Sequence, residues 1–325
     1  MSEYHKDVHQ SVTRVQNRGS REESGAHHSQ MSEMIDGGAA DHPAATTNTP
    51  GPGGVILRVV IAIAVTIIAA MAPSLMTAIP GIRELLNGDV IGRGTTGLVV
   101  AYAVGTAAFA LATVAALVMC CLLWRTLDRG RGVDLRMRPS GRAIAWMLVM
   151  AAIAAAVLCA TAGITHILGA RGEVLEPSGD SAWGQIIAGI AVGFLLQGVP
   201  EELIWRGWLF SSLGGTRKAA IISVLAFSLI HLISQGGQQG VAEHIIYLIM
   251  PCGFAIAAMT VRMVSGTTWA AIGVHGGLHL ANNMLGHHLG VPNGPTTWIV
   301  NGLLWAVVGA AILFIGVRSG RLSRV

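Results

Sequence analysis

Two adjacent glutamates lie within an apolar stretch of the chain. Glu201 and Glu202 follow Pro200, and Arg206 comes four residues after Glu202. Residues four apart share one face of a helix, so Glu202 and Arg206 are predicted to form an ion pair. Glu201 points about 100° away from Glu202 around a helix axis, which leaves its carboxylate for another partner. A salt bridge at a helix end explains the pair, but it leaves the desolvation cost of Glu201 unexplained.

Two further polar clusters follow in later apolar stretches. His231 lies four residues after Phe227, and such a histidine taken alone also suits a hydrogen-bonded interior position. His275, His279 and Asn283 are spaced one helical turn apart, so they are predicted to form one stripe on a helix. Three polar groups on one face of an apolar helix are hard to explain by packing, so this stripe is a candidate site.

Carboxylates and imidazoles together support peptide hydrolysis. A carboxylate beside neutral imidazoles can take a proton from water and pass it to a leaving amine. Histidine or asparagine can donate to the oxyanion of a tetrahedral intermediate. Glutamate and histidine also bind Zn²⁺, with His231 and His275 as the candidate ligands and a glutamate as base. The sequence has no HExxH motif. Proton-coupled transport uses the same residue types and is an alternative.

The composition predicts that membrane-spanning helices position these groups. Hydrophobic residues make up 52% of the 325 and charged residues 12%, whereas soluble domains carry about 25% charged residues. A helix of roughly 20 apolar residues crosses a bilayer. We therefore predict an all-α, polytopic transmembrane bundle of about eight spans, which cover residues 55–79, 97–124, 143–168, 183–210, 219–234, 244–263, 268–285 and 297–317.

The chain divides into a polar tail and a membrane domain. Residues 1–54 are polar and lack apolar periodicity, so they are predicted to be a disordered N-terminal tail. Residues 55–320 are predicted to form the transmembrane domain. Within it, Gly276 and Gly277 are expected to allow close approach of a neighbouring helix.

The basic residues predict the orientation in the membrane. They gather in the loops at 125–142 and 211–218, at the end of the sixth span, and after the eighth. The opposite loops near 171–182, 235–243 and 286–296 hold a single basic residue, Arg171. By the positive-inside rule, both termini are predicted to be cytoplasmic in a multi-pass protein of the cell membrane. The net charge of +4 could suggest nucleic acid as a partner, but this placement at helix ends argues against it and leaves the lipid bilayer as the surroundings.

The depths of the three clusters are compatible with a shared cavity. At 1.5 Å per residue, Glu201 is about 18 Å from the helix end near residue 212. His231 is about 20 Å from the 217–218 loop, and His275 about 10 Å from Thr268. All three therefore fall at intermediate depth in a hydrocarbon core of about 30 Å.

Taken in order, the three clusters resemble the motifs of the CPBP (Abi) intramembrane protease family. This family includes the type II CAAX prenyl endopeptidases and bacterial bacteriocin-processing or self-immunity proteins. The EExxxR motif ends at Arg206, the FxxxH motif ends at His231, and an HxxxN-type element follows Trp269. The resemblance covers about residues 183–290.

The resemblance implies a role for each residue of the first two motifs. Glu201 would activate the attacking water, and Glu202 would assist it while held by Arg206. His231 would assist Glu201 or bind a metal.

In the third motif, the resemblance matches His275 to the catalytic histidine. If Trp269 fixes the register, His279 occupies the family's asparagine position, and a shift of one turn makes Asn283 the match instead. Either residue could complete an oxyanion site.

These observations predict an intramembrane endopeptidase that cleaves a membrane-associated peptide or protein substrate. Glutamate and histidine would activate the water, with or without Zn²⁺. The alternatives are a catalytically silent membrane scaffold or bacteriocin self-immunity protein, and a proton-coupled transporter.

Overall fold

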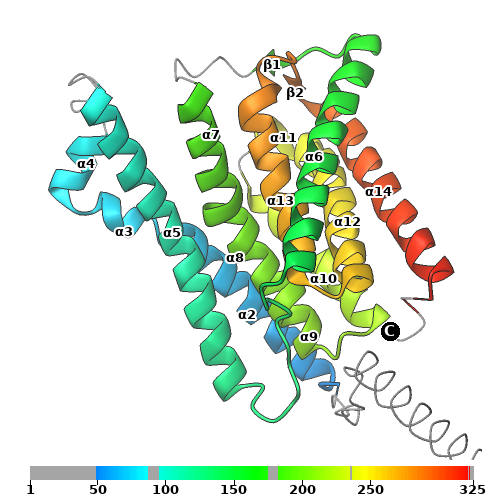
Figure 1. Ribbon diagram of the computed structural model, residues 1–325. Helices are drawn as coiled ribbons and strands as arrows, with labels where there is room; N and C mark the ends of the chain where they lie inside the picture. The colour runs from blue at the N-terminus through cyan, green and yellow to red at the C-terminus, as the bar shows by residue number, and fades with distance from the viewer. Residues whose placement is uncertain (1–48, 87–94, 175–181, 235, 321, 323–325) are drawn as a thin grey trace, which may run out of the picture. The chain divides into compact units, whose positions relative to one another are not determined.

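The computed structural model describes residues 49–86, 95–174, 182–234, 236–320 and 322. Most of the predicted tail, residues 1–48, lies outside the described residues. The described chain is a bundle of helices with one small two-stranded sheet (Figure 1). In this sheet β1 (Glu173–Val174) pairs antiparallel with β2 (Pro292–Asn293), so it ties the connection after α6 to the start of α14.

The helices follow in chain order with few breaks. The α-helices are α2 (Pro52–Met71), α3 (Ser74–Thr77), α4 (Pro80–Leu86), α5 (Thr95–Thr126), α6 (Gly141–Ile167), α7 (Ala182–Ile190), α8 (Val199–Glu202), α9 (Phe210–Ser212), α10 (Arg217–Ile230), α11 (Gly240–Tyr247), α12 (Ile249–Ser265), α13 (Thr268–Ala281) and α14 (Pro295–Arg318). Three segments are π-helical, η2 (Ala191–Gly198), η3 (Leu203–Leu209) and η5 (Asn282–Gly286), and η4 (His231–Ile233) is a 3₁₀ turn.

The predicted all-α membrane bundle is confirmed, and its spans fall into two groups. Among the described residues, six helices are long and apolar enough to cross a membrane: Pro52–Thr77, Thr95–Thr126, Gly141–Ile167, Ala182–Ser212, Gly240–Ser265 and Pro295–Arg318. The other two predicted spans, 219–234 and 268–285, coincide with the shorter helices α10 and α13. The count of about eight is therefore an approximation to six long helices and two short ones.

The short helix α13 lies inside the bundle, against α6, η2 and α12. It runs beside α6 in Figure 1. A Cβ on Gly276 would collide with the ring of Phe194 in η2, and a Cβ on Gly277 would collide with Ala151 in α6. The prediction that these two glycines admit neighbouring helices is therefore confirmed. Because α13 is covered on several sides, it can carry polar side chains away from lipid.

A buried ion pair fixes α2 to the bundle. Arg58 is 4% exposed, and its Nη2 lies 2.6 Å from Oδ1 of Asp128, just after α5. The indole Nε1 of Trp208 in η3 donates to Asp128 Oδ2 at 2.8 Å. Nothing in the sequence pointed to this cluster, because both charged residues lie near the ends of predicted spans, where basic and acidic side chains are ordinary.

Candidate active site

Glu201 and Glu202 lie in the helix Ala182–Ser212, between two π-helical segments. The N–H of Val199 donates to the carbonyl of Phe194, and the N–H of Phe210 donates to the carbonyl of Trp205, each five residues earlier. Pro200 has no N–H and its ring crowds the preceding turn, so a wider turn before it relieves the conflict. Such π segments are frequent at functional sites.

The ion pair that the four-residue spacing predicts is formed. Arg206 Nη1 lies 3.2 Å from Oε1 of Glu202, and both side chains are fully buried. Arg206 Nη2 also donates to the carbonyl of Ala255 in α12 at 3.4 Å. The guanidinium lies 4.2 Å from the ring centroid of Phe227, within the range of a cation–π contact. Arg206 is therefore held from three helices.

The same oxygen of Glu202 holds His275. Nδ1 of His275 lies 2.9 Å from Glu202 Oε1, although the two residues are 73 positions apart. A carboxylate bonded to one ring nitrogen fixes the orientation of an imidazole and directs the other nitrogen away. Glu202 thus links Arg206 to His275, and Nε2 of His275 remains for another partner.

Glu201 lacks the contacts of its neighbour. Its side chain is half-buried, and no hydrogen bond or ion pair joins it to any other described residue. This agrees with the sequence argument that Glu201 points away from the Glu202–Arg206 pair. A half-buried carboxylate without a fixed partner is available to water or to a bound substrate.

His231 caps the end of α10, next to the aromatic cluster. Its Nδ1 lies 2.8 Å from the carbonyl oxygen of Phe227. A carbonyl oxygen only accepts, so Nδ1 carries the proton and Nε2 is left as an acceptor. The ring of His231 packs on that of Phe227 with centroids 4.7 Å apart.

Phe227 connects the three motifs. Besides Arg206 and His231, its ring contacts His275 edge-on at 6.3 Å between centroids. The residue is 1% exposed. The phenylalanine of the FxxxH spacing is therefore a packing centre around which the predicted arginine and two histidines gather.

The three residues of the predicted stripe on α13 and η5 lie at different depths. His279 stacks on His275 with ring centroids 5.2 Å apart, and its Cβ lies beside Gly193. Asn283 lies beside Gly189, one turn further from the glutamates, and is exposed. The stripe therefore faces the Ala182–Ser212 helix, but only His279 lies next to His275.

A cavity of about 280 Å³ opens beside His279. Its walls include Tyr247, Asn282 and Asn301. The cavity is thus bordered by polar groups next to His279, and it offers room for water or a peptide segment.

The arrangement of the donor atoms decides whether this site can hold a metal ion. Among the residues that the structure describes, no three His, Cys, Asp or Glu side chains gather in a way that could hold an ion. Nδ1 of both candidate ligands, His231 and His275, is already engaged, which leaves only their Nε2 atoms as donors. The donor set as arranged does not fit a closed zinc site with three or four protein ligands.

Two uncharged residues contact the site, and the sequence did not predict them. Phe254 in α12 packs edge-on against His275 at 4.7 Å between centroids. The Ser223 hydroxyl donates at 3.0 Å to the carbonyl of Trp205, an acceptor that also serves the π turn. Neither residue carries a charge or a recognisable spacing, so the sequence held no signal for them.

Residues 183–281 match the model of a known family, described as type II CAAX prenyl endopeptidase, Rce1-like. The matched segment contains both glutamates, His231, His275 and His279, and it ends before Asn283. The resemblance predicted from the motifs is therefore confirmed over this segment, and at the level of the family it supports a CAAX-type intramembrane protease. No curated protein matches the chain.

Proposed function

We propose that this protein is an intramembrane endopeptidase in which Glu201 activates the attacking water. The observation that carries the proposal is the difference in burial and bonding between the two adjacent glutamates. Glu202 is fully buried and bonded to Arg206 and His275, whereas Glu201 is half-buried with no bonded partner among the described residues. A general base needs a carboxylate that is free to take a proton.

In the proposed reaction, Glu201 removes a proton from water as the water oxygen attacks the carbonyl carbon of the scissile peptide bond. Nε2 of His231, the unprotonated nitrogen of its ring, accepts a hydrogen bond from the same water and orients it. The C–N bond of the tetrahedral intermediate then breaks, and Glu201 returns its proton to the leaving amine nitrogen.

His275 and His279 are proposed to stabilise the oxyanion. With its Nδ1 held by Glu202 Oε1, His275 directs Nε2 at the oxygen where negative charge develops, and Nε2 donates there in the form that carries its proton. His279, stacked on His275, supplies a second donor in place of Asn283, which lies a turn away. Glu202 and Arg206 then act as positioning residues that hold His275.

The proposal is tested with purified full-length protein and a membrane-peptide substrate. Glu201→Gln keeps the size of the side chain but cannot accept the proton, so cleavage should fall by about 10²–10⁴-fold. The double variant Glu201→Gln with His231→Gln should be hardly slower than either single variant, because groups that act as one unit are non-additive. Glu173→Gln, which changes an exposed carboxylate, is the matched control and should cleave normally.

Chelation separates this mechanism from a metal-assisted one. If water is activated by Glu201 alone, treatment with a chelator should leave turnover unchanged. Loss of turnover that Zn²⁺ restores would instead assign a metal to His231 and His275. A scaffold without catalytic activity would show no cleavage with any variant and normal partner binding in Glu201→Gln.

A further inference from the structure

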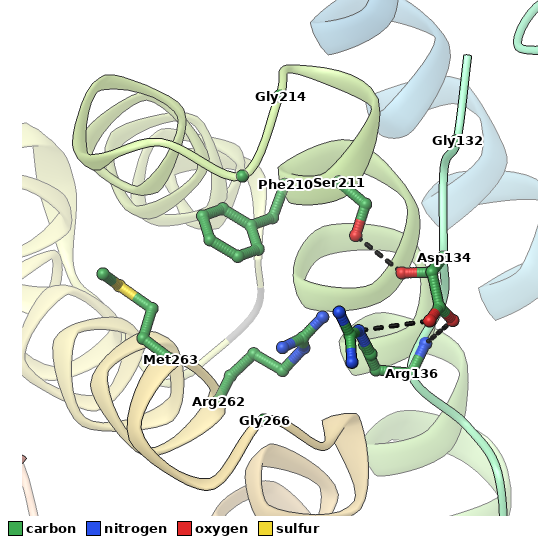
Figure 2. Close-up of a pocket in the computed structure, with 10 residues that line it drawn as sticks. Gly132, Asp134, Arg136, Phe210, Ser211, Gly214, Arg262, Met263 and Gly266 are labelled. Atoms are coloured by element: carbon green, nitrogen blue, oxygen red, sulfur yellow. Dashed lines mark hydrogen bonds and ion pairs between the residues drawn. The ribbon is translucent and has the colours of Figure 1, made fainter. Parts of the chain in front are cut away.

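A second pocket lies at the C-terminal end of the Ala182–Ser212 helix, away from the glutamates. It has a volume of about 270 Å³, and two arginines, Arg136 and Arg262, line it together with Phe210 and Ser211. Figure 2 shows that the two guanidinium groups point toward each other across the pocket. Like charges repel, so a fold that holds two arginines face to face requires a reason.

Arg262 is a buried cation without a counter-ion. It is 5% exposed, and its Nε donates to the Thr268 hydroxyl at 3.1 Å. Its guanidinium lies 5.6 Å from the ring centroid of Phe210. Among the described residues, no carboxylate lies within ion-pair distance of Arg262 and no acceptor is bonded to its two terminal nitrogens. Uncompensated buried charge is strongly unfavourable, so these nitrogens lack the partner that such a cation needs.

Arg136 is held opposite by a constrained loop. Its backbone adopts φ of 52°, a left-handed conformation that is uncommon outside glycine. Asp134 fixes it twice, by accepting its backbone N–H at 2.8 Å and by pairing with its Nε at 3.1 Å. The carbonyl of Arg136 accepts the N–H of Thr268 at the start of α13 at 3.1 Å. Backbone strain that several contacts maintain is a pointer to function.

We propose that this pocket binds a phosphate group, carried by a membrane phospholipid headgroup or free in solution. Asp134 neutralises one guanidinium, so the pocket keeps a net positive charge. Arginine binds phosphate oxygens through paired N–H donors, and two facing arginines can hold one phosphate from both sides. Basic side chains at a membrane border also attract anionic lipid headgroups. Further basic side chains lie at this end of the bundle: Arg129 in the connection between α5 and α6, Arg125 and Arg142 at the adjoining ends of those helices, and Arg217 and Lys218 at the start of α10.

The site is independent of the proposed hydrolysis, since none of its lining residues belongs to the catalytic set. Native mass spectrometry of the delipidated full-length protein in detergent tests it, with short-chain phosphatidylglycerol and inorganic phosphate as separate probes. We expect one saturable site in the wild type. Arg136→Gln should weaken it at least about tenfold through loss of a charge-assisted contact, whereas Arg138→Gln, in the same loop and exposed, should leave it unchanged.

The two probes distinguish the sources of the phosphate. Saturable binding of the lipid assigns a headgroup, and saturable binding of inorganic phosphate alone assigns a soluble ligand. Arg262→Lys is a second variant that keeps a cation and loses the paired donors, so it should also weaken binding. Equal losses in Arg136→Gln and Arg138→Gln, or no saturable binding of either probe to a folded wild type, would overturn the proposal.

Discussion

The pair of Glu202 and Arg206 offers a prediction whose size follows from the structure. Arg206→Ala removes the ion pair at 3.2 Å, the bond to the Ala255 carbonyl, and the contact with Phe227. Removing one partner of a buried pair costs about 3–5 kcal/mol in soluble proteins, because the other charge stays buried and unpaired. The contact with His275 at 2.9 Å offsets part of this by giving the Glu202 carboxylate a remaining donor.

We therefore expect Arg206→Ala to lower the free energy of unfolding by about 3 kcal/mol, at the bottom of that range. Unfolding of the purified protein in mixed micelles by increasing sodium dodecyl sulfate, followed by tryptophan fluorescence, measures this quantity. Trp205 and Trp208 are fully buried in η3 and report on this region. Arg129→Ala is the control, because Arg129 is exposed and such changes usually stay within about 0.5 kcal/mol.

A double variant separates the charge effect from packing. Arg206→Met with Glu202→Gln leaves no unpaired charge, so it should be more stable than Arg206→Ala, since replacing both members of a buried pair is often neutral. Arg206→Ala with the stability of Arg129→Ala would refute the reasoning, because it would mean that Glu202 is not buried as a charged partner.

Three further predictions concern the bundle. Reporter fusions at Leu135 and at the C-terminus should both read cytoplasmic and a fusion at Pro292 external; opposite readings for the first two would refute the predicted orientation. Gly276→Ala should destabilise the protein by about 1–3 kcal/mol through overpacking, whereas Gly163→Ala, which meets open space, should not, as thermal unfolding can show. Asp128→Asn should cost about 3–5 kcal/mol, and unchanged unfolding would mean that the buried pair on α2 contributes nothing.

The sequence predicted the long helices well because apolar length is a local property. The spans at 97–124, 143–168 and 297–317 coincide closely with α5, α6 and α14. The first span, predicted over 55–79, is interrupted, since α2 ends at Met71 just before Pro73. Proline breaks the regular helix there, and a span predicted from hydrophobicity alone does not show the break.

Within the site, the spacing of residues along the chain predicted one contact, and the other contacts depend on how the helices pack. The four-residue spacing gave the Glu202–Arg206 pair. The contact between Glu202 and His275 depends on how α13 meets the Ala182–Ser212 helix, where a Cβ on Gly198 would press against Gly276. No spacing encodes that approach. Likewise, the sequence did not decide whether His279 or Asn283 matches the family's asparagine. Only the folded structure shows that His279 lies beside His275.

The central claim, that Glu201 is the base of a membrane peptidase, can be tested without knowing the substrate. The measurement compares the peptide termini in membranes of cells that produce wild-type protein or Glu201→Gln at equal, verified abundance. We predict a set of new carboxyl termini that appears with the wild type and is lost with Glu201→Gln. The same termini at undiminished levels with Glu201→Gln would contradict the assignment of Glu201 as the base.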